Sequence, residues 1–224
     1  WGELHEAYKQ LQSGYSNNAD ITRMGHVSRG FTGKRLLGYA ESHDKDRLMY
    51  DALTFGNGAG ASPIAGNLNN ALFRMSAIGA TSLLVPGPKM IWHFAELGMN
   101  NSIWTCNNGV VNSDYDNNNP PGDCKLDTKP QPQWTNNWLA VPERARIYND
   151  WSKMINLKRN NPVFKGNYSI SPDGNNVRQR IYIFDNNLPA SQLKNVVILA
   201  NFSVASQGVN PSFPYGGTWV NLMD

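Results

Sequence analysis

The stretch LGYAESHDKDR, residues 37–47, determines how the rest of the chain is interpreted. It begins with small and apolar residues, as a buried strand does, and changes abruptly to a charged cluster. His43 and Asp44 stand side by side where this strand is expected to end. A carboxylate there can stay ionised beside a developing positive charge, and an imidazole can donate a hydrogen bond to a hydroxyl group. On this stretch alone, a strand end followed by a polar loop is the simpler interpretation.

A second stretch, VPGPKMIWHFAELGM, covers residues 85–99. Between the two stretches, apolar residues recur with helical spacing and predict a helix over 67–84, which the Val85-Pro86 step ends. Residues 90–94 are then expected to form another strand. The order strand, helix, strand predicts a parallel βαβ unit.

Together the two stretches resemble the alpha-amylase family of glycoside hydrolases, family 13. Residues 39–44 are similar to the motif of the family's seventh barrel strand, which usually ends in Asn-His-Asp. Residues 87–98 are similar to its eighth-strand motif. Departures from the family pattern are Ser42 in place of the usual Asn, Lys89 where Pro is common, and Phe94 and Ala95 in place of a Gly-Asp pair before Glu96.

The resemblance implies a fold of α/β plus all-β class. Residues 1–164 would be the C-terminal portion of a (β/α)8 TIM barrel, about strands seven and eight with flanking helices. Residues 165–224 would be an antiparallel, β-sandwich-like domain, present in part. The local patterns agree with this division: they predict helices over 2–12 and from 141 to about 160, and short strands at 177–184, 195–202 and 218–220.

The resemblance also implies retaining chemistry on α-glucosidic bonds of starch, glycogen or maltooligosaccharides. Asp44 maps onto the transition-state-stabilising aspartate and His43 onto the adjacent sugar-binding histidine. Arg47 is expected to orient carboxylates or bind substrate, with a surface ion pair to Asp46 or Asp51 as the alternative. His93 and Glu96 are expected to be structural.

The family's nucleophile and acid/base lie on its fourth and fifth strands, which would precede residue 1. Because the chain begins at Trp1 inside a helical pattern, without an initiator methionine, we expect a piece of a longer hydrolase. Retaining cleavage needs two flanking carboxyl groups, so this piece alone is predicted to be inactive. The alternatives are a branching or transglycosylating enzyme, a non-catalytic carbohydrate-binding module, and a structural fragment without glucan affinity.

Charge and hydropathy limit the partners. The net charge is +3, and the basic residues are scattered without a Lys/Arg run, so no nucleic acid is expected. No window approaches 18 consecutive apolar residues, so no membrane span is expected. The expected partners are an α-glucan, the remainder of the chain's own barrel, and a second copy, because two strands alone leave unpaired edges.

Cys106 and Cys124 are the two cysteines of the chain and flank a polar loop. A disulfide in an exported bacterial protein, secreted, periplasmic or on the cell surface, is expected; a reduced cytosolic pair is the alternative. No cofactor is expected, and calcium is the alternative left open. Asp114, Asp116 and Asn118 alternate as calcium ligands can, but the EF-hand pattern fails, so a solvated loop is the favoured interpretation.

Overall fold

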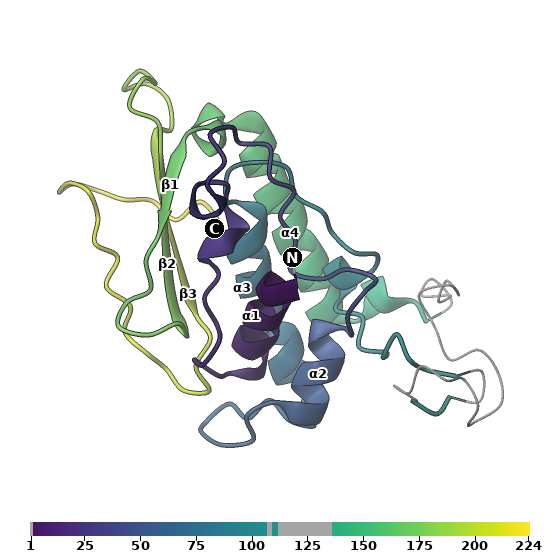
Figure 1. Cartoon of the computed structure of the whole chain (residues 1–224). Coiled ribbons are helices and arrows are strands. Elements are labelled where there is room, and N and C mark those ends of the chain that lie inside the picture. Colours follow the sequence, from purple (N-terminus) through teal and green to yellow (C-terminus); the bar gives the residue numbers. More distant parts are fainter. Residues whose placement is uncertain (1, 107–108, 112–135) are drawn as a thin grey trace.

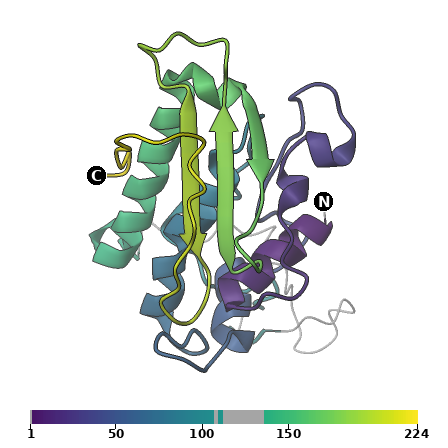
Figure 2. The ribbon, with the colours of Figure 1, turned by 90° about the vertical axis from the view of Figure 1, so that its left-hand side faces the viewer.

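The computed structural model describes residues 2–106, 109–111 and 136–224 and arranges them as a layer of helices against a three-stranded sheet (Figure 1). In Figure 2 the sheet lies in front of the helical layer. No helix in the described ranges is long and apolar enough to cross a membrane. The elements are α1 (Gly2–Ser13), η1 (Thr22–Met24), η2 (Val27–Arg29), α2 (Leu48–Phe55), α3 (Leu68–Leu83), η3 (Ala95–Leu97), η5 (Trp138–Ala140), α4 (Pro142–Asn160), η6 (Pro162–Lys165), β1 (Asn167–Ile170), β2 (Arg178–Phe184) and β3 (Asn195–Asn201).

The three predicted helices are confirmed as α1, α3 and α4. Each begins or ends where the sequence provides a signal. At the start of α3, the side chain of Asn67 accepts a hydrogen bond from the backbone N–H of Asn70, as an N-cap residue does. Pro142 occupies the first turn of α4, where its missing N–H has no intrahelical partner to lose.

Helix α2 was not predicted from the sequence. The helix exists because it places three apolar side chains, Leu48, Met49 and Ala52, on one face that is fully buried. It packs against α1 and α3. Eight residues are too few for a clear helical period in a sequence, so tertiary packing decides this element.

The sheet has the order β1-β2-β3 and is antiparallel throughout. Along β2 and β3, buried and partly exposed residues alternate, as in a sheet with one face on a core. Ile181 pairs with Ile198 in the register. Strands β2 and β3 confirm the predictions for 177–184 and 195–202. Strand β1 was not predicted, because its four residues carry little apolar pattern of their own.

The predicted strand at 218–220 is wrong: this segment has no regular structure. Val220 is largely exposed, so pairing this segment with a neighbouring strand would not bury its apolar side chain. The C-terminal segment instead folds on its own aromatic rings. Phe213 stacks on Trp219 with ring centroids 4.4 Å apart, and Tyr215 lies 5.2 Å from the same indole ring.

The two predicted parallel strands are reduced to a single parallel bridge between Gly38 and Lys89. The N–H of Gly38 donates to the carbonyl oxygen of Pro88 at 3.1 Å, and the N–H of Met90 donates to that of Gly38 at 3.1 Å. Proline at 86 and 88 removes two backbone donors from this ladder. A two-stranded pair is also marginal without further strands beside it. The bridge nevertheless fixes the parallel orientation that the sequence predicted.

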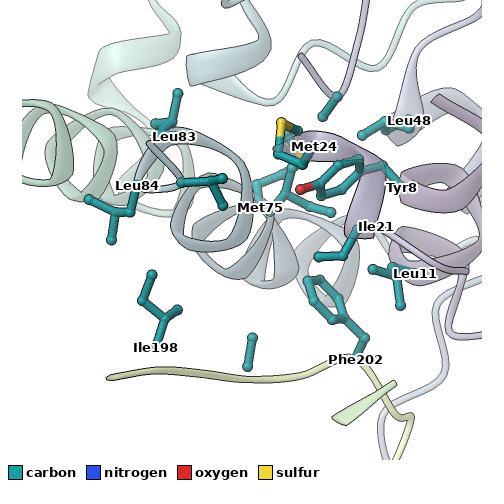
Figure 3. Packing of buried hydrophobic residues seen from close by; sticks show 14 of the residues in the cluster. Tyr8, Leu11, Ile21, Met24, Leu48, Met75, Leu83, Leu84, Ile198 and Phe202 are labelled. Atoms are coloured by element: carbon teal, nitrogen blue, oxygen red, sulfur yellow. The ribbon is translucent and has the colours of Figure 1, made fainter. Parts of the chain in front are cut away.

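One continuous apolar core runs through both layers. In Figure 3, Leu84 at the end of α3 lies on the side of Ile198, whereas Leu83 points away from the sheet and Met75 lies close to Tyr8 of α1. The same core includes residues on both sides of the predicted domain boundary at 164/165. The boundary stays a prediction, and what the structure adds is that the two predicted parts share their buried surface.

Candidate active site

Asp44 and His43 lie in an exposed turn between the parallel bridge and α2. Nε2 of His43 is 3.0 Å from Oδ1 of Asp44, and their side chains are 58% and 68% exposed. The backbone N–H of Asp44 donates a 3.4 Å hydrogen bond to Oγ of Ser42, which stiffens the turn. A carboxylate and an imidazole are thus presented together to a ligand from solvent.

The other carboxylates of residues 41–46 are held by the protein itself. Glu41 is 4% exposed, and its Oε1 accepts the backbone N–H of Leu48 at 2.6 Å. Asp46 accepts hydrogen bonds from Oγ of Ser102 at 2.6 Å and from the N–H of Ile103 at 3.0 Å. Within residues 41–46, therefore, Asp44 carries the one carboxylate that faces mostly solvent.

A row of aromatic rings stands beside the turn. The ring of His43 lies 5.6 Å from that of Trp92, which lies 4.5 Å from His93, and His93 lies 5.4 Å from Phe94. These residues follow Lys89 in the bridge, as His43 follows Gly38. The ends of the two parallel segments therefore meet at the same edge, as the strand, helix, strand order predicted.

Arg47 lies beneath this surface, because its guanidinium is only 1% exposed. Nη1 is 3.5 Å from Oε2 of Glu41, and Nη2 is 3.2 Å from Nε2 of His93. The carboxylate partner is thus Glu41 and the pair is buried, in place of the predicted alternative of a surface pair with Asp46 or Asp51. Sugar contact by Arg47 remains a prediction, and the observed contacts are all internal.

Burial and charge act together on these groups. Burial raises the pKa of Glu41, and the charge of Arg47 opposes that rise. Burial, helped by the positive charge of Arg47, lowers the pKa of His93, which favours the neutral form of this imidazole. The expectation of a structural histidine at 93 agrees with these contacts.

Glu96 lies in η3, a tight turn bounded by two residues in the left-handed region, Phe94 at φ 62° and Gly98 at φ 63°. A side chain at 98 would meet Cδ2 of Leu72 at 2.4 Å, so glycine is needed there. Glu96 is partly buried, and burial raises its pKa. Phe94 adopts the left-handed conformation although it is not a glycine.

The loops around the site are held by two residues whose anchoring contacts the sequence did not predict. Asp46 ties the turn after the bridge to residues 102–103 by the contacts given above. Arg144 on α4 donates to the carbonyl oxygens of Leu97 at 2.7 Å and Gly98 at 2.6 Å, and its guanidinium lies 4.0 Å from the ring of Trp138. Both anchor through contacts distant in sequence, so local patterns contain no signal for them.

The calcium alternative falls on Asp114, Asp116 and Asn118, which lie outside the described residues. Within the ranges that the structure describes, no group of three or more His, Cys, Asp or Glu side chains is arranged to hold a metal ion. Cys106 is disulfide-bonded. Cys124, its predicted partner, also falls outside the described residues.

Comparisons with known proteins support the fold. No protein-family model matches the chain, and no curated protein sequence matches it. Among solved structures, the chain is similar to an alpha-amylase from H. orenii, with a TM-score of 0.54 and 16% identity over 89% of this chain. The chain spans 38% of that protein's length. At this identity the likeness shows a shared fold, and the three-stranded sheet packed on helices is consistent with part of an alpha-amylase-like protein.

Proposed function

We propose that this chain is part of a retaining glycoside hydrolase of the alpha-amylase type, acting on α-glucans such as starch, glycogen or maltooligosaccharides. The observation that carries the proposal is the exposed Asp44–His43 pair at the edge where the two parallel segments end. The alpha-amylase-like fold supports it. In this proposal the two segments are the seventh and eighth strands of a TIM barrel whose other strands belong to the rest of the protein.

The proposed role of Asp44 is electrostatic. Cleavage of a glycosidic bond develops positive charge at the anomeric carbon and ring oxygen, and a nearby carboxylate stabilises that charge in the transition state. His43, whose Nε2 lies 3.0 Å from Oδ1 of Asp44, is placed to hold the carboxylate, and its other ring nitrogen can form a hydrogen bond with a sugar hydroxyl. The partly buried aromatic row that includes Trp92 provides an apolar wall on which a sugar ring can stack.

The nucleophile and the acid/base of this chemistry are proposed to lie on the rest of the barrel. The carboxylates nearest Asp44 in sequence are engaged elsewhere, Glu41 with Arg47 and Asp46 with Ser102. Neither is presented to solvent beside Asp44. A pair of carboxyl groups roughly 5 Å apart on either side of one bond must therefore come from other segments.

The test is hydrolysis of starch and of an activated α-glucoside by the full-length protein and by this chain. We expect Asp44→Asn to lower kcat of the full-length protein by at least about 10²-fold, because the amide keeps the shape and removes the charge. Asp185→Asn, in the β2–β3 connection, is the matched control and should leave kcat unchanged. The chain alone should not turn over either substrate. Near-normal turnover in Asp44→Asn would remove Asp44 from the catalytic set.

A further inference from the structure

Glu41 and Arg47 bracket the turn that presents His43 and Asp44. They are separated by five residues in sequence, and their charged groups meet below the turn at 3.5 Å. The ion pair therefore joins the two ends of the turn. Oε1 of Glu41 also accepts a hydrogen bond from the N–H of Leu48, so Glu41 connects the start of the turn to the first residue of α2.

A buried ion pair contributes little net stability to a turn, because both charges lose their hydration. Removing two charges from water costs several kcal/mol, and replacing such a pair with apolar residues is often neutral or stabilising. A contribution to folding stability therefore explains the presence of Glu41 and Arg47 poorly. The contacts of Arg47 with the aromatic row suggest another role.

Arg47 contacts one ring nitrogen of His93. A guanidinium has only donors, so its 3.2 Å contact requires Nε2 of His93 to be the acceptor. The proton of the neutral ring must then lie on Nδ1. The guanidinium also lies 5.8 Å from the centroid of the Trp92 ring, within the range of a cation–π contact. Trp92 in turn lies against His43.

These contacts form an unbroken path from the buried pair to the exposed one. We propose that Glu41 and Arg47 are positioning residues, which act through His93 and Trp92 to hold His43 and Asp44 in the geometry needed for sugar binding and charge stabilisation. The inference rests on the proposed function for its catalytic consequence. Its structural half, control of the His93 tautomer and of the His43 ring, holds independently of any substrate.

The structural half is tested by NMR of this chain labelled with ¹⁵N at histidine. Long-range ¹H–¹⁵N spectra distinguish the two nitrogens of each ring. We expect wild-type His93 to be a single Nδ1–H tautomer. In Arg47→Met, which keeps length and removes all donors, the two His93 nitrogen shifts should move toward each other as the tautomers mix, and the His43 signals should shift. Arg47→Lys keeps the charge without the planar fork and should restore the tautomer in part. Arg159→Met, an exposed arginine on the same chain, is the control.

A second variant, Glu41→Gln, tests the same contact if Arg47→Met does not fold. If Arg47→Met does not fold, Glu41→Gln keeps the shape of the partner and should shift the His93 and His43 signals in the same direction, but less. Wild-type His93 and His43 spectra in a folded Arg47→Met variant, or in Glu41→Gln when Arg47→Met is unfolded, would overturn the proposal.

The catalytic half is tested in the full-length protein. Arg47→Met should lower kcat tenfold or more with little change in KM, and Arg47→Lys should recover part of the loss. An unchanged kcat in a variant whose His93 tautomer has changed would overturn the positioning role while leaving the proposed function intact. Activity that does not depend on Asp44 would instead refute the proposed function and leave the NMR result standing.

Discussion

Arg74, on α3, donates a 3.1 Å hydrogen bond from Nη1 to the carbonyl oxygen of Ser203, just after β3. The same guanidinium donates from Nε to the carbonyl of Gln12 at 2.9 Å and from Nη2 to that of Leu11 at 2.6 Å. One buried cation thus satisfies the C-terminal carbonyls of α1 and the chain leaving the sheet. It joins segments on both sides of residue 164.

Replacing Arg74 should therefore destabilise both parts of the chain together. We expect Arg74→Met to lower the free energy of unfolding by about 3 kcal/mol, because several buried carbonyl groups lose their donor at once. Urea unfolding followed by circular dichroism and by tryptophan fluorescence measures it. Arg159→Met, an exposed site on α4, is the control and should change stability by less than about 0.5 kcal/mol. Two separate transitions in the wild type would show instead that the predicted domains unfold independently.

The elements that the sequence predicted well are those whose information is local. Helices α1, α3 and α4 are long enough to repeat their apolar period several times, and Asn67 and Pro142 mark two of their starts. The elements that it missed depend on partners elsewhere in the chain. Helix α2 is defined by burial of Leu48 and Met49 against α1 and α3, and β1 by its pairing with β2.

In the candidate site, too, contacts between sequence neighbours could be predicted and contacts between distant residues could not. The adjacency of His43 and Asp44 could be read directly, because neighbours in an exposed turn remain neighbours in the fold. The contact between Arg47 and His93 spans 46 residues and depends on how the two parallel segments align. Five residues lie between Glu41 and Arg47 in the sequence, and no helical or strand period brings such a spacing together. The buried ion pair between Glu41 and Arg47 therefore could not be predicted from the sequence.

Gly79 on α3 is a site where helix propensity and packing predict opposite effects. In an isolated helix, Gly→Ala stabilises by up to about 1 kcal/mol. Here a Cβ at 79 would lie 2.3 Å from Nε1 of Trp151, which donates a 2.8 Å hydrogen bond to the carbonyl of Met75. We expect Gly79→Ala to destabilise by about 1–3 kcal/mol, because α3 and α4 must separate or the indole must leave its partner.

The matched control for this prediction is Gly58→Ala, because nothing lies within 4 Å of a Cβ built there. Its stability should stay within about 0.5 kcal/mol of the wild type. Thermal unfolding of both variants decides the point. A Gly79→Ala protein that melts at or above the wild-type temperature would show that the interface between α3 and α4 repacks without cost.

The disulfide at Cys106 gives a third prediction. Cys106 is bonded, and Cys124 is the other cysteine of the sequence. We expect protein prepared in an oxidising compartment to contain no free thiol when titrated under denaturing, non-reducing conditions. Closing a loop of this length stabilises by about 3 kcal/mol in the chain-entropy model, so reduction should lower the unfolding free energy by up to that amount. Two free thiols in freshly exported protein would refute the prediction.

The last prediction concerns two titratable groups that line one groove of about 300 Å³ beside α1 and α2. His5 is buried, with Nδ1 3.1 Å from the carbonyl oxygen of Ala40, and burial lowers its pKa to about 4. Burial raises the pKa of Asp51 to about 6. The ordinary values are 6.5 for histidine and 3.8 for aspartate, so the two shifts cover nearly the same pH range in opposite directions.

The signs follow from proton linkage. Between pH 6.5 and 4 the unfolded chain binds a proton at His5 that the folded chain does not, so this residue makes stability fall as pH falls. Between pH 6 and 3.8 the folded chain binds a proton at Asp51 that the unfolded chain does not, so this residue makes stability rise as pH falls. Each effect is at most about 3 kcal/mol.

Relative to the wild type, Asp51→Asn should therefore lose stability as pH falls from 6 to 4, and His5→Asn should gain it. Urea unfolding at pH 7, 6, 5 and 4 measures both differences, and the other charged groups of the groove, Glu6, Lys9, Lys45 and Asp46, are common to all three proteins. Parallel stability curves for the three proteins would show that neither group titrates differently on folding.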